Sequence, residues 1–354
     1  GLIFFNAIFY SEIKDERINN INNNIEKLII QYDELGQNKD KAAQRQILNE
    51  ALLLIEEGSV FEFNDLFELL KLDIQKREKL FNNIFLVSNS DKLLIFENNF
   101  ANSFFPNKLV SNSYLIWILD SGSGRIFQYT ISDNSFIEIF RQNNFINDIL
   151  LGEPITMSYD QFGKKLFILD SNNNLFVKKL NNQLDVYSLD SFSSNVKFVD
   201  DMEIYNDDLY IYDSNLNEIL LSKFQNTAQN EYFKFTNLIK LEEKILGIDF
   251  NKKLLLFTSG NIWQYNDSLI EFSCLGIDEF PSKISDVIFG ESYEQIFIAD
   301  NERNRIIECN NGKDFKGQWV NKDFIDIKSL FYDSNNQNLY ALTSSSIFEI
   351  EISE

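Results

Sequence analysis

The chain has 354 residues, is 44% hydrophobic, and carries 54 acidic against 32 basic side chains, which gives a formal net charge of −22. It contains no histidine and only two cysteines. These counts exclude histidine-based catalysis, zinc sites with histidine ligands and cysteine-rich metal centres. An acidic surface would also repel phosphates, so nucleic acid is not an expected partner. The length leaves room for a small helical module and one large β domain.

The first ten residues, GLIFFNAIFY, are nearly all apolar. Ten residues are too few to cross a bilayer, which needs about 20. The stretch also lacks the basic leader and small-residue cleavage site of a signal peptide. We interpret residues 1–10 as the trailing end of a membrane helix that starts before this sequence, or as an apolar tail that docks on a partner. The alternative is a helix start packed on its own domain.

Residues 11–83 show helical periodicity and predict a stalk of about three helices. Apolar residues of the first helix recur at steps of three and four, which is heptad spacing. They are Ile18, Ile21, Ile25, Leu28, Tyr32 and Leu35. Gly36 is expected to end this helix.

A second helix is expected over about 39–57, with Ala43, Ile47 and Leu54 on its apolar side. A third follows Asn64, a residue type that favours the N-cap. Three helices with short connections indicate a helical hairpin or small bundle, whose apolar faces are buried internally or against a partner.

Six hairpins organise residues 84–354, and each has an apolar strand, an Asp or Thr, a polar turn and a second apolar strand. The residues that end the first strands are Asp120, Asp170, Asp213, Thr258, Asp300 and Thr343. Their intervals of 50, 43, 45, 42 and 43 residues leave room for four strands each, which is typical of propeller blades. The sequence therefore predicts a mainly β chain with a six-bladed β-propeller.

The third strand of the last blade, at 346–352, is followed by too few residues for a fourth strand. The outer strand of this blade must therefore come from another part of the sequence. Ile84–Ser88 or Lys92–Phe96, just before the first blade, could supply that strand and close the ring.

The hairpins LFILDSNNNLF and LYIYDSNLNEI resemble those of six-bladed propellers of the NHL and YWTD type, over roughly residues 84–354. The resemblance implies a propeller that most often binds proteins, with lactonases and lyases as the minority. Thr258 and Thr343 depart from the pattern, so a role that needs a complete ring of Asp is not implied. In layout, helices before a propeller resemble the membrane-proximal stalks of bacterial surface proteins.

Two hairpins carry a weak calcium signal. Asp170 and Asn172, and likewise Asp213 and Asn215, place oxygen ligands at alternate positions, as at the start of an EF-hand loop. Neither hairpin has the Gly at position six or the Glu at position twelve of that loop. Asx turns that stabilise the hairpins are the simpler interpretation, and no cofactor other than a possible calcium ion is expected.

Glu203 stands in an acidic cluster around a predicted inner strand. An inner-strand acid could line the channel and bind a metal, as in the lactonase-type propellers, although a solvated loop is the simpler interpretation. Cys274, in an expected outer strand, and Cys309, in a third strand, could form a disulfide in an oxidising compartment. Two separate buried thiols are the simpler alternative.

Three functions follow as hypotheses. The preferred one is a non-enzymatic, extracytoplasmic module for protein or ligand binding or sensing, anchored at a membrane or cell surface through residues 1–10. The second is a structural subunit of a surface layer, filament or large complex that assembles through the N-terminal helices. The third is a metal-dependent, lactonase-like hydrolase. Fold alone does not choose among them.

Overall fold

The computed structural model describes residues 2–37, 40–60, 65–98, 100, 103–181, 183–189, 199–226, 231–310 and 314–352. Its contacts divide the chain into two compact units. The helical unit comprises Gly1–Phe85, Ser273–Phe280 and Gly312–Gln318. The propeller unit comprises Leu86–Phe272, Pro281–Asn311 and Trp319–Glu354.

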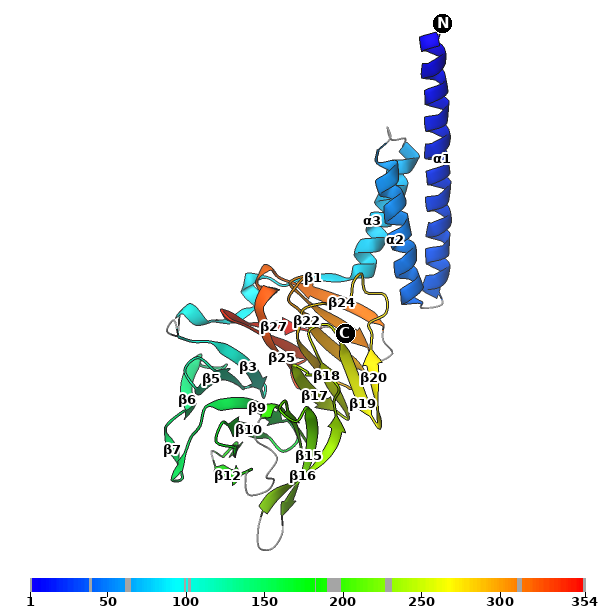
Figure 1. The fold of residues 1–354 in the computed structure, drawn as a ribbon. Helices are drawn as coiled ribbons and strands as arrows, with labels where there is room; N and C mark the ends of the chain where they lie inside the picture. The colour runs from blue at the N-terminus through cyan, green and yellow to red at the C-terminus, as the bar shows by residue number, and fades with distance from the viewer. Residues whose placement is uncertain are drawn as a thin grey trace. The chain divides into compact units, whose positions relative to one another are not determined.

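The helical unit contains the three predicted helices, α1 (Leu2–Gln37), α2 (Lys41–Gly58) and α3 (Asp65–Asn82). Helix α1 starts at Leu2, so the apolar N-terminal residues are helical and continuous with the first predicted helix. Figure 1 shows α1 running past the ends of the other two helices. Asp40 is the N-cap of α2, and its carboxylate accepts the Ala43 N–H at 3.0 Å. The expected N-cap Asn64 lies outside the described residues.

The heptad face of α1 is buried, with Ile25 at its centre. On α2 the buried face is centred on Leu48, Ala51 and Ile55, about one residue beyond the predicted side, because α2 contacts both α1 and α3. Ile47 and Leu54 are partly buried at the edge of the same cluster. None of the helices in the described ranges is both long and apolar enough to cross a bilayer.

The propeller has six blades, each a four-stranded antiparallel sheet with one additional strand on blade five (Figure 1). Blade one contains β3 (Pro106–Ser111), β4 (Leu115–Asp120), β5 (Arg125–Thr130) and β6 (Ser135–Arg141). Blade two contains β9 (Pro154–Asp160), β10 (Lys165–Asp170), β11 (Asn174–Lys179) and β12 (Leu184–Ser188). Blade three contains β13 (Val199–Tyr205), β14 (Asp208–Asp213), β15 (Glu218–Asn226) and β16 (Glu231–Lys240). The short β7 (Phe145–Ile146) and β8 (Ile149–Leu150) pair with each other between blades one and two.

The remaining blades continue the pattern. Blade four contains β17 (Gly247–Asn251), β18 (Lys253–Phe257), β19 (Ile262–Asn266) and β20 (Ser268–Phe272). Blade five contains β21 (Ile284–Phe289), β22 (Gln295–Asp300), β23 (Arg305–Asn310) and β24 (Phe315–Val320). Blade six contains β25 (Ile327–Asp333), β26 (Asn338–Thr343) and β27 (Ser346–Glu351). The predicted six-bladed propeller is confirmed.

The ring closes through β2 (Lys92–Ile95), which pairs antiparallel with β27 and supplies the outer strand of blade six. Leu94 lies opposite Ile347 in this pairing, and Ile95 opposite Ser346. Of the two predicted candidates, Lys92–Phe96 is therefore correct. The other is wrong, since β1 (Ile84–Leu86) lies beside β24 as a fifth strand of blade five.

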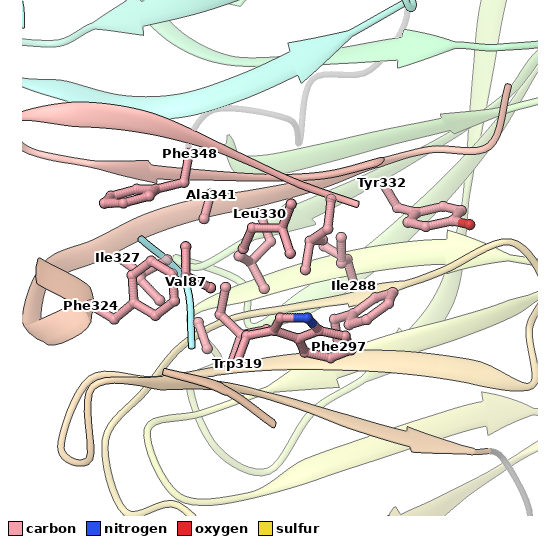
Figure 2. Close-up of a cluster of buried hydrophobic side chains, with 14 of the residues drawn as sticks. Val87, Ile288, Phe297, Trp319, Phe324, Ile327, Leu330, Tyr332, Ala341 and Phe348 are labelled. Carbon is pink, nitrogen blue, oxygen red and sulfur yellow. The ribbon is translucent and has the colours of Figure 1, made fainter. Parts of the chain in front are cut away.

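Apolar side chains fill the space between neighbouring blades. Figure 2 shows this for blades five and six, where Trp319 and Phe297 lie across from Leu330 and Ala341. The ring of Phe297 is 5.9 Å from that of Trp319 and stacks on Tyr332 at 5.7 Å, measured between ring centroids. Burial on both faces explains why the second strands of the blades, such as β4 and β10, read as nearly continuous apolar runs.

Ring closure gives a stability prediction with a matched control on one strand. Leu94→Ala should lower the free energy of unfolding by about 3 kcal/mol, because Leu94 is buried against β27. Ile95→Ala, one residue on and 37% exposed, should cost less than about 1 kcal/mol. Urea unfolding followed by tryptophan fluorescence measures both, since all three tryptophans lie in blades. Equal costs would argue against β2 as the closing strand.

Candidate functional site

The six hairpin residues hold turns. Asp170, which is fully buried, accepts backbone N–H groups from Asn172 at 3.0 Å, Asn174 at 2.8 Å and Gly152 at 2.8 Å. Asp120, Asp213 and Asp300 are likewise buried and accept N–H groups of their own turns. These contacts are those of Asx turns.

The two threonines, Thr258 and Thr343, stabilise their turns in the same way, with a single acceptor oxygen each. Oγ1 of Thr258 accepts the N–H groups of Gly260 and Asn261 at 3.4 and 3.1 Å. Oγ1 of Thr343 accepts the N–H of Ser346 at 3.1 Å. A single acceptor oxygen with two lone pairs is enough for such a turn, which explains the exchange of Asp for Thr.

The hairpin residues suggested for calcium are engaged in these turns. Oδ1 of Asp213 accepts N–H groups from Asn215 and Leu216, and the Asn172 side chain donates to the Leu150 carbonyl at 3.2 Å. Within the described ranges, no group of three or more acidic or cysteine side chains is arranged to hold a metal ion.

The inner strands of the propeller surround a polar channel instead. Strands β3, β9, β13, β17, β21 and β25 contact one another in a closed ring. One cavity of about 520 Å³ opens along them. Its polar lining from these strands includes Lys108, Ser158, Asp201, Glu203, Asp249, Asp286 and Ser329. The sequence analysis singled out only Glu203 and its acidic neighbours, and it missed Lys108, Asp249 and Asp286.

β-Bulges position four of these side chains. The pairing register shifts immediately before Lys108, Asp201, Asp286 and Ser329. A bulge adds one residue to a strand and re-aims the side chain next to it. Each bulge therefore turns a polar residue of an otherwise apolar strand toward the channel.

The channel side chains also join one blade to the next. Carboxylates of Asp201, Asp249 and Asp286 accept the backbone N–H of the following inner strand, from Ile248 at 3.0 Å, Phe289 at 2.6 Å and Leu330 at 2.6 Å. The hydroxyl oxygens of Ser158 and Ser329 accept in the same way from Ile204 at 3.2 Å and Leu109 at 3.3 Å. Between blades one and two the corresponding residue is Lys108, which has no acceptor atom on its side chain.

Lys108 neutralises part of this acidic channel. Its Nζ donates to Asp201 and, at 3.4 Å, to Glu203, whose other oxygen accepts from Ser158 at 2.7 Å. Burial alone would lower the pKa of Lys108, but the two carboxylates raise it above its ordinary value. The ammonium therefore stays charged and takes the position between Asp201 and Glu203 that a metal cation would need.

Three carboxyl groups of the channel, those of Glu203, Asp249 and Asp286, have raised pKa values. Burial raises the pKa of Glu203 and of Asp249, and nearby carboxylates add to the effect. Burial raises the pKa of Asp286 to about 7, although Lys108 and the Leu330 N–H act in the opposite direction. The channel is thus acidic but partly protonated near neutral pH.

Aromatic side chains form a rim along one side of the mouth of the cavity. Phe162, Tyr205 and Phe250 come from turns or strand ends of three successive blades and line the cavity. The Phe162 and Tyr205 rings meet edge to face at 5.1 Å, and so do those of Tyr205 and Phe250. Behind them, Phe250 stacks on Tyr210 at 4.1 Å. The rim is a packed apolar surface next to buried charge.

Both cysteines, Cys274 and Cys309, are disulfide-bonded. They are the only two in the chain. The simpler alternative of two separate thiols is therefore wrong. Cys309 lies in β23 as predicted, whereas Cys274 follows the end of β20 and is not in a strand.

No protein-family model and no curated protein sequence matches the chain. Similar solved structures include the RRP9 WD40 repeats, at TM-score 0.50 and 12% identity over 71% of this chain and 96% of that one. The nidogen/laminin complex gives 0.46 and 14% over 65% and 85%, and a streptogramin B lyase gives 0.46 and 12% over 68% and 77%. At such low identity the likeness concerns the fold alone. The protein is a six-bladed β-propeller preceded by three helices.

Removing the channel cation should destabilise the propeller. Lys108→Met leaves Asp201 and Glu203 without their ammonium, so we expect the free energy of unfolding to fall by about 3–5 kcal/mol. Lys165→Met is the control, because the Lys165–Asp207 pair lies at the surface and should contribute under about 1 kcal/mol. Urea unfolding distinguishes the two, and a Lys108 variant no less stable than the control would contradict the assignment.

Asp286 should make stability depend on pH. Its folded-state pKa of about 7 lies above that of an unfolded Asp, so its contribution is present at low pH and is lost as pH rises through 7. The groups that set this pKa by charge are Lys108, Asp201 and Asp249. Because Asp286 as a residue keeps some exposure to solvent, we expect about 2 kcal/mol less stability at pH 8 than at pH 5 from it.

Asp286→Asn should remove this part of the pH dependence while keeping an acceptor for the Leu330 N–H. Glu271→Gln, an exposed change in the outer strand of blade four, should leave the wild-type pH profile unchanged. Identical pH profiles for wild type and Asp286→Asn would count against the prediction.

Proposed function

We propose that this chain is a non-enzymatic binding or sensing module of an extracytoplasmic, oxidising compartment. The observation that carries the proposal is the channel. Its carboxylates are occupied by backbone N–H groups of adjacent blades and by Lys108, while its mouth opens into a cavity of about 520 Å³ with an aromatic rim. Rigid concave surfaces of this size are typical of ligand sites.

The disulfide supports the choice of compartment. Disulfides persist in secreted, periplasmic and surface proteins and are rare where thiols are kept reduced. The acidic composition, with a net charge of −22, favours solubility and keeps copies apart. Both properties suit a protein that works outside the cytoplasm.

The N-terminal helix supports attachment near a membrane or to a partner. Helix α1 runs past α2 and α3 in Figure 1, and its first residues are those of the apolar sequence GLIFFNAIFY. An apolar helix end that extends from its own bundle would be stabilised by lipid or by another protein. We propose that this end tethers the module.

A structural subunit is the second candidate, and exposed side chains on the helices favour it. Leu53, Leu69 and Leu80 are 66%, 65% and 70% exposed. Such residues could support self-assembly through the helical unit. A lactonase-like hydrolase has less support, because the ammonium of Lys108 opposes a second cation between Asp201 and Glu203.

Two measurements test the proposed function. Protein taken from the cells that produce it, with thiols trapped by alkylation at the moment of lysis, should gain two alkyl groups only when reductant is added first. A Cys274→Ser, Cys309→Ser double variant should gain none in either case. Alkylation without reductant would contradict an oxidising compartment.

For the non-enzymatic part, we expect the wild-type protein to show no Glu203-dependent hydrolysis of lactone or ester probes, with or without added calcium or manganese. Glu203→Gln should therefore leave any background hydrolysis unchanged. Glu271→Gln serves as the control. Turnover that disappears only in the Glu203 variant would overturn the proposal in favour of the hydrolase.

A further inference from the structure

We propose that the channel mouth binds a small organic ammonium ion, with its charged head on Asp249 and Asp286 and its apolar part against the rim formed by Phe162, Tyr205 and Phe250. This inference rests on the proposed function, since it names the ligand class of the binding module. It follows from three features of one cavity.

The first feature is an uneven distribution of charge. Besides Asp160 and Glu291 of the rim, four carboxylates line the cavity, and Lys108 pairs with only two of these four, Asp201 and Glu203. Asp249 and Asp286 accept backbone N–H groups, and no basic side chain in the described ranges forms an ion pair with either. A carboxylate oxygen can accept more than one hydrogen bond, so both acids can still accept from an ammonium. Anionic ligands would be repelled here.

The second feature is the rim. Phe162, Tyr205 and Phe250 lie in sequence around one side of the mouth, with edge-to-face contacts of 5.1 Å between neighbours. The negative face of an aromatic ring attracts a cation and also packs against apolar groups. A bare metal ion would not use such a surface, whereas an organic amine would use both the rings and the acids.

The third feature is size. A cavity of about 520 Å³ lies within the range of 300–1,000 Å³ that is usual for small-molecule sites. It accommodates a molecule of one ring and a short chain. Asp249 and Asp286 come from inner strands of adjacent blades, β17 and β21, so one ammonium head can lie against both strands.

Binding should also depend on pH in a defined direction. The charged groups of the inner strands around Asp286 are Lys108 on β3, Asp201 and Glu203 on β13, and Asp249 on β17. Strands β9 and β25 contribute the uncharged Ser158 and Ser329, and the charged residues of the rim are Asp160, Lys252 and Glu291. An ammonium favours ionised carboxylates. Affinity should therefore rise between pH 6 and pH 8, with release of protons.

The experiment measures binding of phenethylamine to the full chain by isothermal titration calorimetry at pH 6 and pH 8. Phenethyl alcohol, the neutral counterpart, is the control ligand. We expect the amine to bind at least about tenfold more tightly than the alcohol at pH 8, because hydrogen bonds to charged groups are the stronger ones. The amine should bind more weakly at pH 6, and buffers of different ionisation enthalpy should reveal the released protons.

Two variants locate the site. Asp286→Asn should weaken amine binding at least about tenfold, while Glu271→Gln should not change it. Phe162→Leu should weaken it about threefold. Phe162 is 64% exposed, so this variant remains informative even if Asp286→Asn does not fold.

Absence of amine binding, equal binding of amine and alcohol, or amine binding unchanged by Phe162→Leu would each overturn the inference. These results differ from a failure of the proposed function, which would appear as free thiols or as turnover. If the disulfide is intact, no turnover is found and the amine does not bind, the protein would remain a binding module, but for another class of ligand.

Discussion

The propeller depends on a ring of hydrogen bonds at its axis. Each blade can bury its apolar faces only between two neighbours, so the blades must be held at a fixed angle and spacing. Carboxylates and hydroxyls of the inner strands do this by accepting an N–H of the next blade, as Asp286 does from Leu330 at 2.6 Å. The same side chains line the channel, and the architecture and the candidate site are therefore built from one set of residues.

This shared use explains the chemistry of the channel. An acid that fastens two blades must lie where solvent is scarce, and burial then raises its pKa, as for Asp249 and Asp286. Several such acids in one channel repel each other, and Lys108 relieves part of that repulsion at the one junction where no acceptor is available. The remaining negative charge is what a cationic ligand would meet at the mouth.

Much of the architecture could be predicted because it depends on local and periodic signals. Asp170 and Asp213 mark hairpins through turn chemistry that involves only nearby residues, and Ile25 marks the buried face of α1 through helical spacing.

The channel was harder to predict. Lys108 and Asp286 reach it because of β-bulges, and a bulge shifts which face of a strand a residue occupies without an obvious mark in the sequence. A polar residue that interrupts an apolar strand about a dozen positions before the hairpin residue, as Lys108 precedes Asp120, is the signal that could have found it. The pairing of Cys274 with Cys309 depends on the approach of separate segments, which spacing does not encode.

Closure of the ring by β2 and β27 has a consequence for the order of folding. The two strands lie about 250 residues apart in sequence, so their pairing closes a loop that spans nearly the whole propeller. Long-range pairing of this kind slows folding, since the entropy of the loop is lost before the contact is gained. Blade six cannot be completed until residues 346–351 are available, and a growing chain would carry an open arc of blades until then. The propeller can therefore reach its closed form only after nearly all of its residues have been made.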